Sequence, residues 1–213
     1  TGSLKVALAG LGTVGGGVAR VLAEEKSRIA ERCGRAIEIN AISSRTRTKA
    51  DGLPLSGAQW FDDPRVMARD VKADVVVEVI GGETTAAGVI EAAIDAGRHV
   101  VTANKSLLAV RGAELARRAE ARGVSLKFEA AVAGGIPIIK ALKEGLVGNS
   151  VTRAYGILNG TCNYILTQME QTGRPFAQVL SDAQKLGYAE ADPTMDVSGG
   201  DAGEDAAIYC RRR

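Results

Sequence analysis

The chain up to residue 130 alternates between two patterns of hydrophobic positions. Runs that are apolar almost throughout are typical of buried strands in a parallel sheet, and they predict strands over 4–9, 37–42, 73–80, 99–102 and 126–130. Apolar residues spaced three and four apart predict helices over 18–32, 86–96 and 114–122. Because strands and helices alternate with short connections, we expect an α/β fold with a parallel sheet covered on both faces.

The pattern changes near residue 134. Hydrophobic periodicity then predicts helices over 137–146, 161–170 and 175–186, and residues 151–158 resemble a strand. Gly187 directly follows the last helix, in the position where a glycine commonly ends one. We therefore expect two domains, residues 1–133 and 134–213, with the parallel sheet in the first.

Composition excludes several classes of protein. The 213 residues are 46% hydrophobic, which is enough to bury a core and excludes an intrinsically disordered chain. The 27 basic and 25 acidic residues balance too evenly for a nucleic-acid-binding surface, and no apolar run reaches the roughly 18 residues of a membrane span. Three cysteines without a CxxC pair, a single histidine and no signal peptide favour a cytoplasmic protein without a disulfide scaffold or zinc site.

A glycine-rich segment follows the first predicted strand and opens the first helix. It reads Gly10-Leu11-Gly12-Thr13-Val14-Gly15, and its glycines have the spacing of a dinucleotide-binding loop. In such loops the first glycine permits a tight turn, the second lets a pyrophosphate approach the backbone, and the third allows close packing of helix on strand. The alternative is a glycine-rich turn with no ligand.

The end of the second predicted strand indicates which dinucleotide is bound. An acidic residue there would hydrogen-bond the ribose 2′-hydroxyl of NAD, but the strand ends in Ser43-Ser44-Arg45. Arg45 can pair with a 2′-phosphate, which favours NADP over NAD. The alternative is a solvated basic loop.

Four later segments carry a resemblance to a known family. They read VTANKSLLA (101–109), FEAAVAGGIPIIKAL (128–142), GILNGTCNYILT (156–167) and GYAEADPTMDVSGGD (187–201). Together with the glycine loop, they closely resemble homoserine dehydrogenase. The resemblance implies hydride transfer between NADP or NAD and a small molecule, L-homoserine or L-aspartate 4-semialdehyde, in threonine, methionine and isoleucine biosynthesis. It also implies a Rossmann-type domain, a following α+β substrate and dimerisation domain that is incomplete here, and a homodimer or larger homo-oligomer.

The same resemblance assigns roles to individual residues. Lys105, which follows a predicted strand and can donate to a carbonyl oxygen, contacts cofactor and substrate, and Asp201 orients the reacting end of the substrate. The substrate ammonium group suits carboxylates, and the implied substrate-binding residues are Thr161, Tyr188, Glu190 and Asp196. The implied cofactor-binding residues are Gly10, Gly12, Thr13, Val14, Gly15, Arg45, Lys105, Gly187 and Glu190. From position alone, Lys105 is equally a surface lysine, and a solvated acidic loop is the more usual interpretation of the carboxylates.

A monovalent cation, Na⁺ or K⁺, is implied by resemblance alone. Similar enzymes bind one with backbone carbonyls at positions that match Glu129, Val132, Gly134 and Ile136. A tight glycine-rich turn exposes such oxygens, which suit hard cations. The ion would be structural.

The last dozen residues depart from the family pattern. After Asp201 the family continues Ala-Ala-His-Lys, whereas this chain continues Ala-Gly-Glu-Asp, so that the expected catalytic lysine falls on Asp205. We expect a frameshift or an artificial terminus here, with cofactor binding retained and turnover severely reduced.

Three alternative functions remain. A non-catalytic NADP-binding Rossmann module would bind NADP without homoserine. An aspartate-semialdehyde dehydrogenase would need an activated cysteine, and none has an activating setting. A methyltransferase would be expected to place an acidic residue where Arg45 stands.

Overall fold

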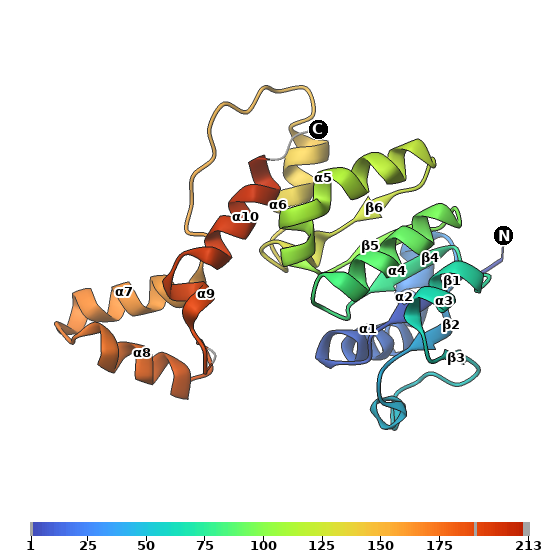
Figure 1. Cartoon of the computed structure of the whole chain (residues 1–213), viewed down its shortest axis with the longest axis horizontal. Helices are drawn as coiled ribbons and strands as arrows, with labels where there is room; N and C mark the ends of the chain where they lie inside the picture. The colour runs from blue at the N-terminus through green and yellow to red at the C-terminus, as the bar shows by residue number, and fades with distance from the viewer. Residues whose placement is uncertain (1, 190, 211–213) are drawn as a thin grey trace. The chain divides into compact units, whose positions relative to one another are not determined.

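The computed structural model describes residues 2–189 and 191–210, without the side chains of residues 209 and 210 (Figure 1). The chain forms two compact units, Thr1–Gly135 and Ile136–Arg213, and each is described by itself.

The first unit contains a six-stranded sheet. Its strands are β1 (Leu4–Ala9), β2 (Ile37–Ser43), β3 (Gln59–Phe61), β4 (Val75–Glu78), β5 (His99–Thr102) and β6 (Leu126–Lys127). They lie in the order β3-β2-β1-β4-β5-β6, and every neighbouring pair is parallel. This is the order of a Rossmann sheet, which confirms the predicted α/β fold and places a switch point between β1 and β4. The three-residue β3 was not predicted, because it is too short to show a pattern.

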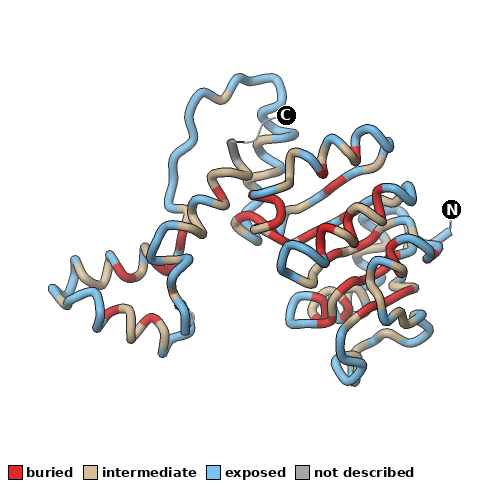
Figure 2. Tube along the Cα trace, viewed as in Figure 1, coloured by how far each residue is buried: buried red, intermediate tan, exposed pale blue. Residues whose placement is uncertain are grey.

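Five α-helices accompany the described part of this sheet: α1 (Thr13–Glu24), α2 (Lys26–Cys33), α3 (Pro64–Asp70), α4 (Thr84–Asp95) and α5 (Lys105–Ala121). α4 packs between α3 and α5 (Figure 1). Buried residues concentrate on the strands and on one side of α1, α3, α4 and α5 (Figure 2), and Leu8, Ile90 and Leu107 are fully buried. The core thus fixes the strand ends from which the loops emerge.

Two helices in this unit begin earlier in the chain than we predicted. The helix expected over 18–32 begins at Thr13 and is interrupted at Glu25, where α1 gives way to α2. The helix expected over 114–122 begins at Lys105, because Asn104 caps it by accepting a hydrogen bond from the Leu107 amide at 3.1 Å. Lys105 is therefore the first residue of a helix.

All the regular secondary structure in the described part of the second unit is helical. It contains α6 (Ile138–Lys140), a π-helical turn (Ala141–Gly145), α7 (Gly160–Thr172), α8 (Phe176–Lys185), α9 (Thr194–Val197) and α10 (Gly200–Cys210). α7 and α8 confirm two of the predicted helices, and they bury Ile165, Val179 and Ala183 together. The predicted strand over 151–158 was wrong: this segment is extended but pairs with no described strand, and Tyr155 is 93% exposed.

No helix within residues 2–189 and 191–210 combines the length and the apolar character that a membrane crossing requires.

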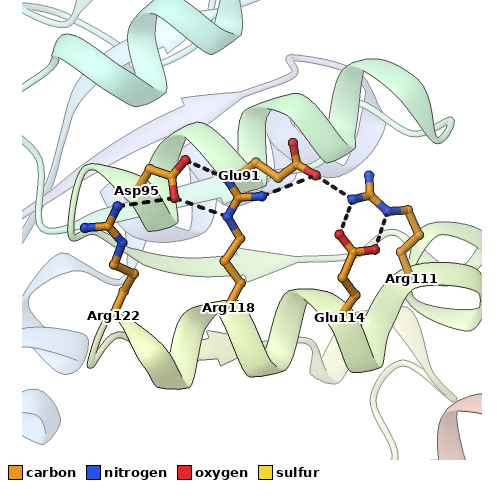
Figure 3. Close-up of polar contacts among 6 residues, drawn as sticks. All are labelled: Glu91, Asp95, Arg111, Glu114, Arg118 and Arg122. Atoms are coloured by element: carbon orange, nitrogen blue, oxygen red, sulfur yellow. Dashed lines mark hydrogen bonds and ion pairs between the residues drawn. The ribbon is translucent and has the colours of Figure 1, made fainter.

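A row of six charged side chains joins α4 to α5 (Figure 3): Glu91, Asp95, Arg111, Glu114, Arg118 and Arg122. Arg111 donates to Glu91 at 2.6 Å, and Arg118 donates to Asp95 at 2.6 and 3.1 Å. Hydrogen bonds from Arg118 hold the pKa of Asp95 below its ordinary value, and those from Arg111 do the same for Glu114. Single pairs this exposed contribute little, but the row links α4 to α5 at two places, Glu91 and Asp95.

We expect acid to weaken the first unit through Asp95 and Glu114. A carboxylate with a lowered pKa in the folded chain stabilises the fold above its unfolded pKa of about 4, and this stabilisation is lost as the pH falls through the folded pKa. The urea midpoint, followed by the fluorescence of the single tryptophan, Trp60, should therefore fall below about pH 4.

Asp95→Asn should make that fall smaller. Glu120→Gln is the matched control, because Glu120 is exposed on α5, the helix that carries Arg118, and it should leave the profile unchanged. An Asp95→Asn profile identical to the parent profile would contradict the role given to the charged row.

Candidate active site

The glycine loop lies where β1 meets the end of β4. Gly10 has a φ of +106°, and a Cβ there would lie 2.7 Å from the carbonyl oxygen of Val79. A Cβ on Gly15 would lie 2.0 Å from the carbonyl oxygen of Gly10. At Gly12, in contrast, no atom lies within 4 Å of the Cβ position. The first and third glycines are thus required by close packing, whereas the second leaves open space beside the backbone.

The start of α1 borders that open space. Gly12 is the N-terminal cap of α1 and, as a glycine, has no side chain that could accept from the first amides of the helix. Thr13 and Val14, which follow it, are exposed. The first N–H groups of a helix have no partner within the helix and carry a partial positive charge. This arrangement can hold a phosphate.

The end of β2 is attached to the same loop. The Gly10 amide donates to the Ser43 carbonyl oxygen at 2.8 Å, and Arg45 follows in an exposed position. Arg47 lies 4.9 Å from the ring centroid of Trp60 and 3.5 Å from Asp62. Within the described part of the chain, the Arg45 guanidinium has neither a hydrogen-bond nor an ion-pair partner. Arg45 can therefore bind an anion, whereas Arg47 is already engaged.

Lys105 lies at the carboxyl edge of the sheet. It opens α5, three residues beyond Thr102, the last residue of β5. Ligands of open α/β sheets bind at this edge, so Lys105 is on the side of the unit that holds the glycine loop.

The second unit brings together two pairs of the predicted site residues, Asp196 with Asp201 and Thr161 with Tyr188. The Asn159 amide nitrogen donates to Asp196 at 2.8 Å and to Asp201 at 2.9 Å. The Thr161 hydroxyl donates to the carbonyl oxygen of Tyr188 at 2.7 Å. Glu190, which we expected to bind both substrate and cofactor, lies outside the described residues. Gly187 ends α8 with a φ of +77°, as its position after the helix predicted.

Sequence analysis missed Asn159. Its side-chain oxygen accepts from the Cys162 amide at 2.7 Å and so caps α7, while its nitrogen holds two carboxylates. An asparagine directly before a helical segment is a capping signal, but nothing in the sequence shows where its other end points. Asp192, in contrast, hydrogen-bonds Thr194, which lowers its pKa and fits a residue that shapes a turn.

Asp205 lies on the helix that carries Asp201. The two are four residues apart on α10, hence on one face, and Asp205 is 3% exposed. The position at which a catalytic lysine was expected therefore holds the buried side chain of an aspartate.

The expected cation ligands lie on a turn after β6. Glu129 accepts from the Gly135 amide at 3.0 Å, and Ala133 and Gly135 have positive φ values of 49° and 85°. Val132 and Gly134 belong to this turn, while Ile136 is the first residue of the second unit. Among the described residues no group of three or more His, Cys, Asp and Glu side chains could hold a metal. A site of backbone carbonyls remains a prediction.

Both units match the models of known protein domains. Residues 10–129 match the NAD-binding domain of homoserine dehydrogenase, and residues 137–212 match homoserine dehydrogenase. The chain belongs to the homoserine dehydrogenase family. The second match runs through α10 and Asp205.

Individual members of the family are similar over nearly the whole chain. The homoserine dehydrogenase of Pseudomonas aeruginosa is 50% identical over 207 residues, which are 96% of this chain and 47% of that protein. The crystal structure of the Thiobacillus denitrificans enzyme has 47% identity and a TM-score of 0.89, over 97% of this chain and 48% of that one. A hyperthermophilic archaeal homoserine dehydrogenase in complex with NADPH has 28% identity and a TM-score of 0.83, over 97% and 68%. The chain thus spans about half the length of the curated relatives it matches.

We expect Asn159→Asp to destabilise the second unit at neutral pH. The substitution keeps the oxygen that caps α7 but replaces a donor with an acceptor, so that three carboxylates face one another without a hydrogen to share. The cost should be about 1–3 kcal/mol, measured by urea unfolding followed by circular dichroism.

Asn163→Asp is the matched control, because Asn163 is exposed on the same helix, and it should have little effect. If both substitutions cost the same at neutral pH, Asn159 does not hold the two carboxylates together.

Proposed function

We propose that this chain provides the cofactor-binding and substrate-binding parts of an NAD(P)-dependent homoserine dehydrogenase. The reaction interconverts L-homoserine and L-aspartate 4-semialdehyde, in threonine, methionine and isoleucine biosynthesis. The observation that carries the proposal is the glycine loop, in which Gly10 and Gly15 are tightly packed while Gly12 faces open space at the switch point of the sheet. Membership of the family supports it.

The first unit fits a nicotinamide dinucleotide. The N-terminus of α1, with Gly12, Thr13 and Val14, would hold the pyrophosphate. Arg45 would pair with a 2′-phosphate, so NADP is preferred to NAD, in keeping with the NADPH bound by the archaeal relative. When bound, the nicotinamide supplies or accepts the hydride. Gly187 and Glu190 are proposed to complete the cofactor site.

The second unit would bind the amino acid. Thr161, Tyr188, Glu190 and Asp196 are proposed to bind homoserine, with the carboxylates facing its ammonium group. Asp201 would orient the reacting end, and Lys105 would donate a hydrogen bond to the reacting oxygen and stabilise negative charge there. Oxidation of the alcohol also releases a proton, and the residue expected to carry it, a lysine, is replaced by Asp205.

Two further assignments rest on the resemblance. We propose that a monovalent cation, Na⁺ or K⁺, is held by backbone carbonyls of Glu129, Val132, Gly134 and Ile136, and that it is structural. We also propose a cytoplasmic homodimer or larger homo-oligomer. Exposed apolar side chains at Leu146, Val147 and Ile157 support an assembly, because a partner would remove them from water.

A non-catalytic NADP-binding module is the second candidate. It is favoured by one observation, the buried Asp205 in place of the expected lysine. Such a module would retain cofactor binding and would not bind homoserine.

We expect Arg45→Gln to weaken NADPH binding about tenfold or more, because a charge-assisted hydrogen bond to the 2′-phosphate is lost. Binding of NADH, which has no such phosphate, should be unchanged. Arg47→Gln is the matched control and should leave both affinities near the parent values, since Arg47 is engaged by Trp60 and Asp62. Calorimetric titration of each variant with both cofactors measures this. Equal losses for the two cofactors would refute the role of Arg45.

We expect the chain to bind NADPH and homoserine but to turn over slowly. Asp205→Lys should raise the homoserine-dependent reduction of NADP about a hundredfold or more, because it restores a group that can carry a proton. Asp205→Asn, which removes the charge without adding such a group, should not. Absorbance at the nicotinamide band follows turnover, and calorimetry follows each ligand. Binding of NADPH without homoserine would favour the module, and absence of NADPH binding would overturn both candidates.

A further inference from the structure

We propose that Glu78 is a positioning residue, which joins the loop between β4 and α4 to the beginning of α5 and thereby fixes Lys105 relative to the glycine loop. Glu78 is the last residue of β4 and is fully buried. Nothing in the resemblance or in the reaction described above uses it. The inference rests on the proposed function, because it concerns the edge of the sheet at which the cofactor would bind.

The Glu78 carboxylate accepts hydrogen bonds from two separate segments. One oxygen accepts from the amides of Ile80 at 2.8 Å and Gly81 at 3.3 Å, in the loop that leads to α4. The other accepts from the hydroxyl of Thr102 at 2.6 Å, at the end of β5. These three partners are all donors, so the ionised carboxylate suits the site and a neutral amide does not.

Thr102 and Asn104 close this arrangement into a ring. The Thr102 oxygen accepts from the Asn104 amide at 3.1 Å, and the Asn104 side-chain nitrogen donates to the Gly82 carbonyl oxygen at 2.6 Å. The chain of contacts thus returns to the loop that Glu78 holds. We call Glu78, Thr102, Asn104 and the backbone of residues 80–82 the Glu78 ring. Thr102 is 1% exposed and Asn104 is 6% exposed, so water cannot replace these bonds easily.

The Glu78 ring touches both parts of the proposed cofactor site. Val79, between Glu78 and the loop, packs against the positions of Gly10 and Gly15, and its amide donates to Ala9 at 2.9 Å. Asn104 caps α5 and is followed directly by Lys105. A change in the ring therefore displaces the wall of the glycine loop and the first turn of α5 together.

The burial of the Glu78 carboxylate indicates that this residue holds two segments in place and does not only stabilise the fold. A fully buried ionised group is costly unless several hydrogen bonds compensate it, and an apolar side chain at the end of β4 would avoid that cost. An apolar side chain would leave the three donors unsatisfied and the two segments unconnected. The carboxylate is long enough, and has enough acceptor positions, to hold both segments.

The test compares Glu78→Gln with Arg98→Met in the full chain. Glu78→Gln places an amide hydrogen against the Thr102 hydroxyl, while the shape is kept. Arg98 donates to the carbonyl oxygens of Ala68 and Arg69 in α3 and of Val71 at the end of that helix. None of these residues belongs to the Glu78 ring, so the loss of Arg98 should lower stability without moving the site. Thr102→Val is a second variant, which breaks the ring and leaves Glu78 in place.

Two readouts are measured at a temperature at which every variant is folded. Amide hydrogen exchange should accelerate by at least about tenfold at residues 79–83 and 104–108 in Glu78→Gln and Thr102→Val, but not in Arg98→Met. The dissociation constant for NADPH should rise by at least about tenfold in the same two variants only. Equal affinities across all three variants would overturn the inference. Failure of the parent chain to bind NADPH would instead overturn the proposed function.

Discussion

The site depends on a contact between backbones. The glycine loop after β1 approaches the end of β4 so closely that Gly10 and Gly15 leave no room for a side chain. This approach sets where α1 begins, holds the end of β2 through the bond between Gly10 and Ser43, and leaves the space beside Gly12 open. Because β1 leads to β2 on one side of this switch point and β4 leads to β5 on the other, the opening is a feature of the topology and not of any single side chain.

In both units an asparagine side chain at the start of a helix also binds a second segment. In each, an asparagine caps a helix with its side-chain oxygen and uses its nitrogen to hold a different segment: Asn104 holds the Gly82 carbonyl, and Asn159 holds Asp196 and Asp201. An amide is suited to this, because it carries an acceptor and two donors on a short side chain. The helix starts are thereby tied to the residues proposed to act on substrate and cofactor.

The two units differ in how closely they follow the expected chemistry. The first retains each element of a dinucleotide site that sequence reasoning required, including an exposed Arg45 without a partner among the described residues. The second retains the carboxylates proposed for substrate, whereas Asp205 replaces the lysine proposed for proton transfer. A carboxylic acid buried on the same helix face as Asp201 has neither the charge nor the reach of a lysine.

The sequence by itself determined the parallel sheet, the glycine loop and the family, because these depend on local patterns: apolar runs, glycine spacing and contiguous motifs. It did not predict the strand β3, the start of α5 or the irregular path of residues 151–158, because these depend on pairing partners and caps. Only the tertiary structure showed that Arg47 contacts Trp60 and Asp62, whereas Arg45 has no partner among the residues that the structure describes. It also showed that Glu78, Thr102 and Asn104 form a ring. These contacts join residues that are distant in the sequence and meet only when the strands are aligned. No local sequence pattern can therefore predict them.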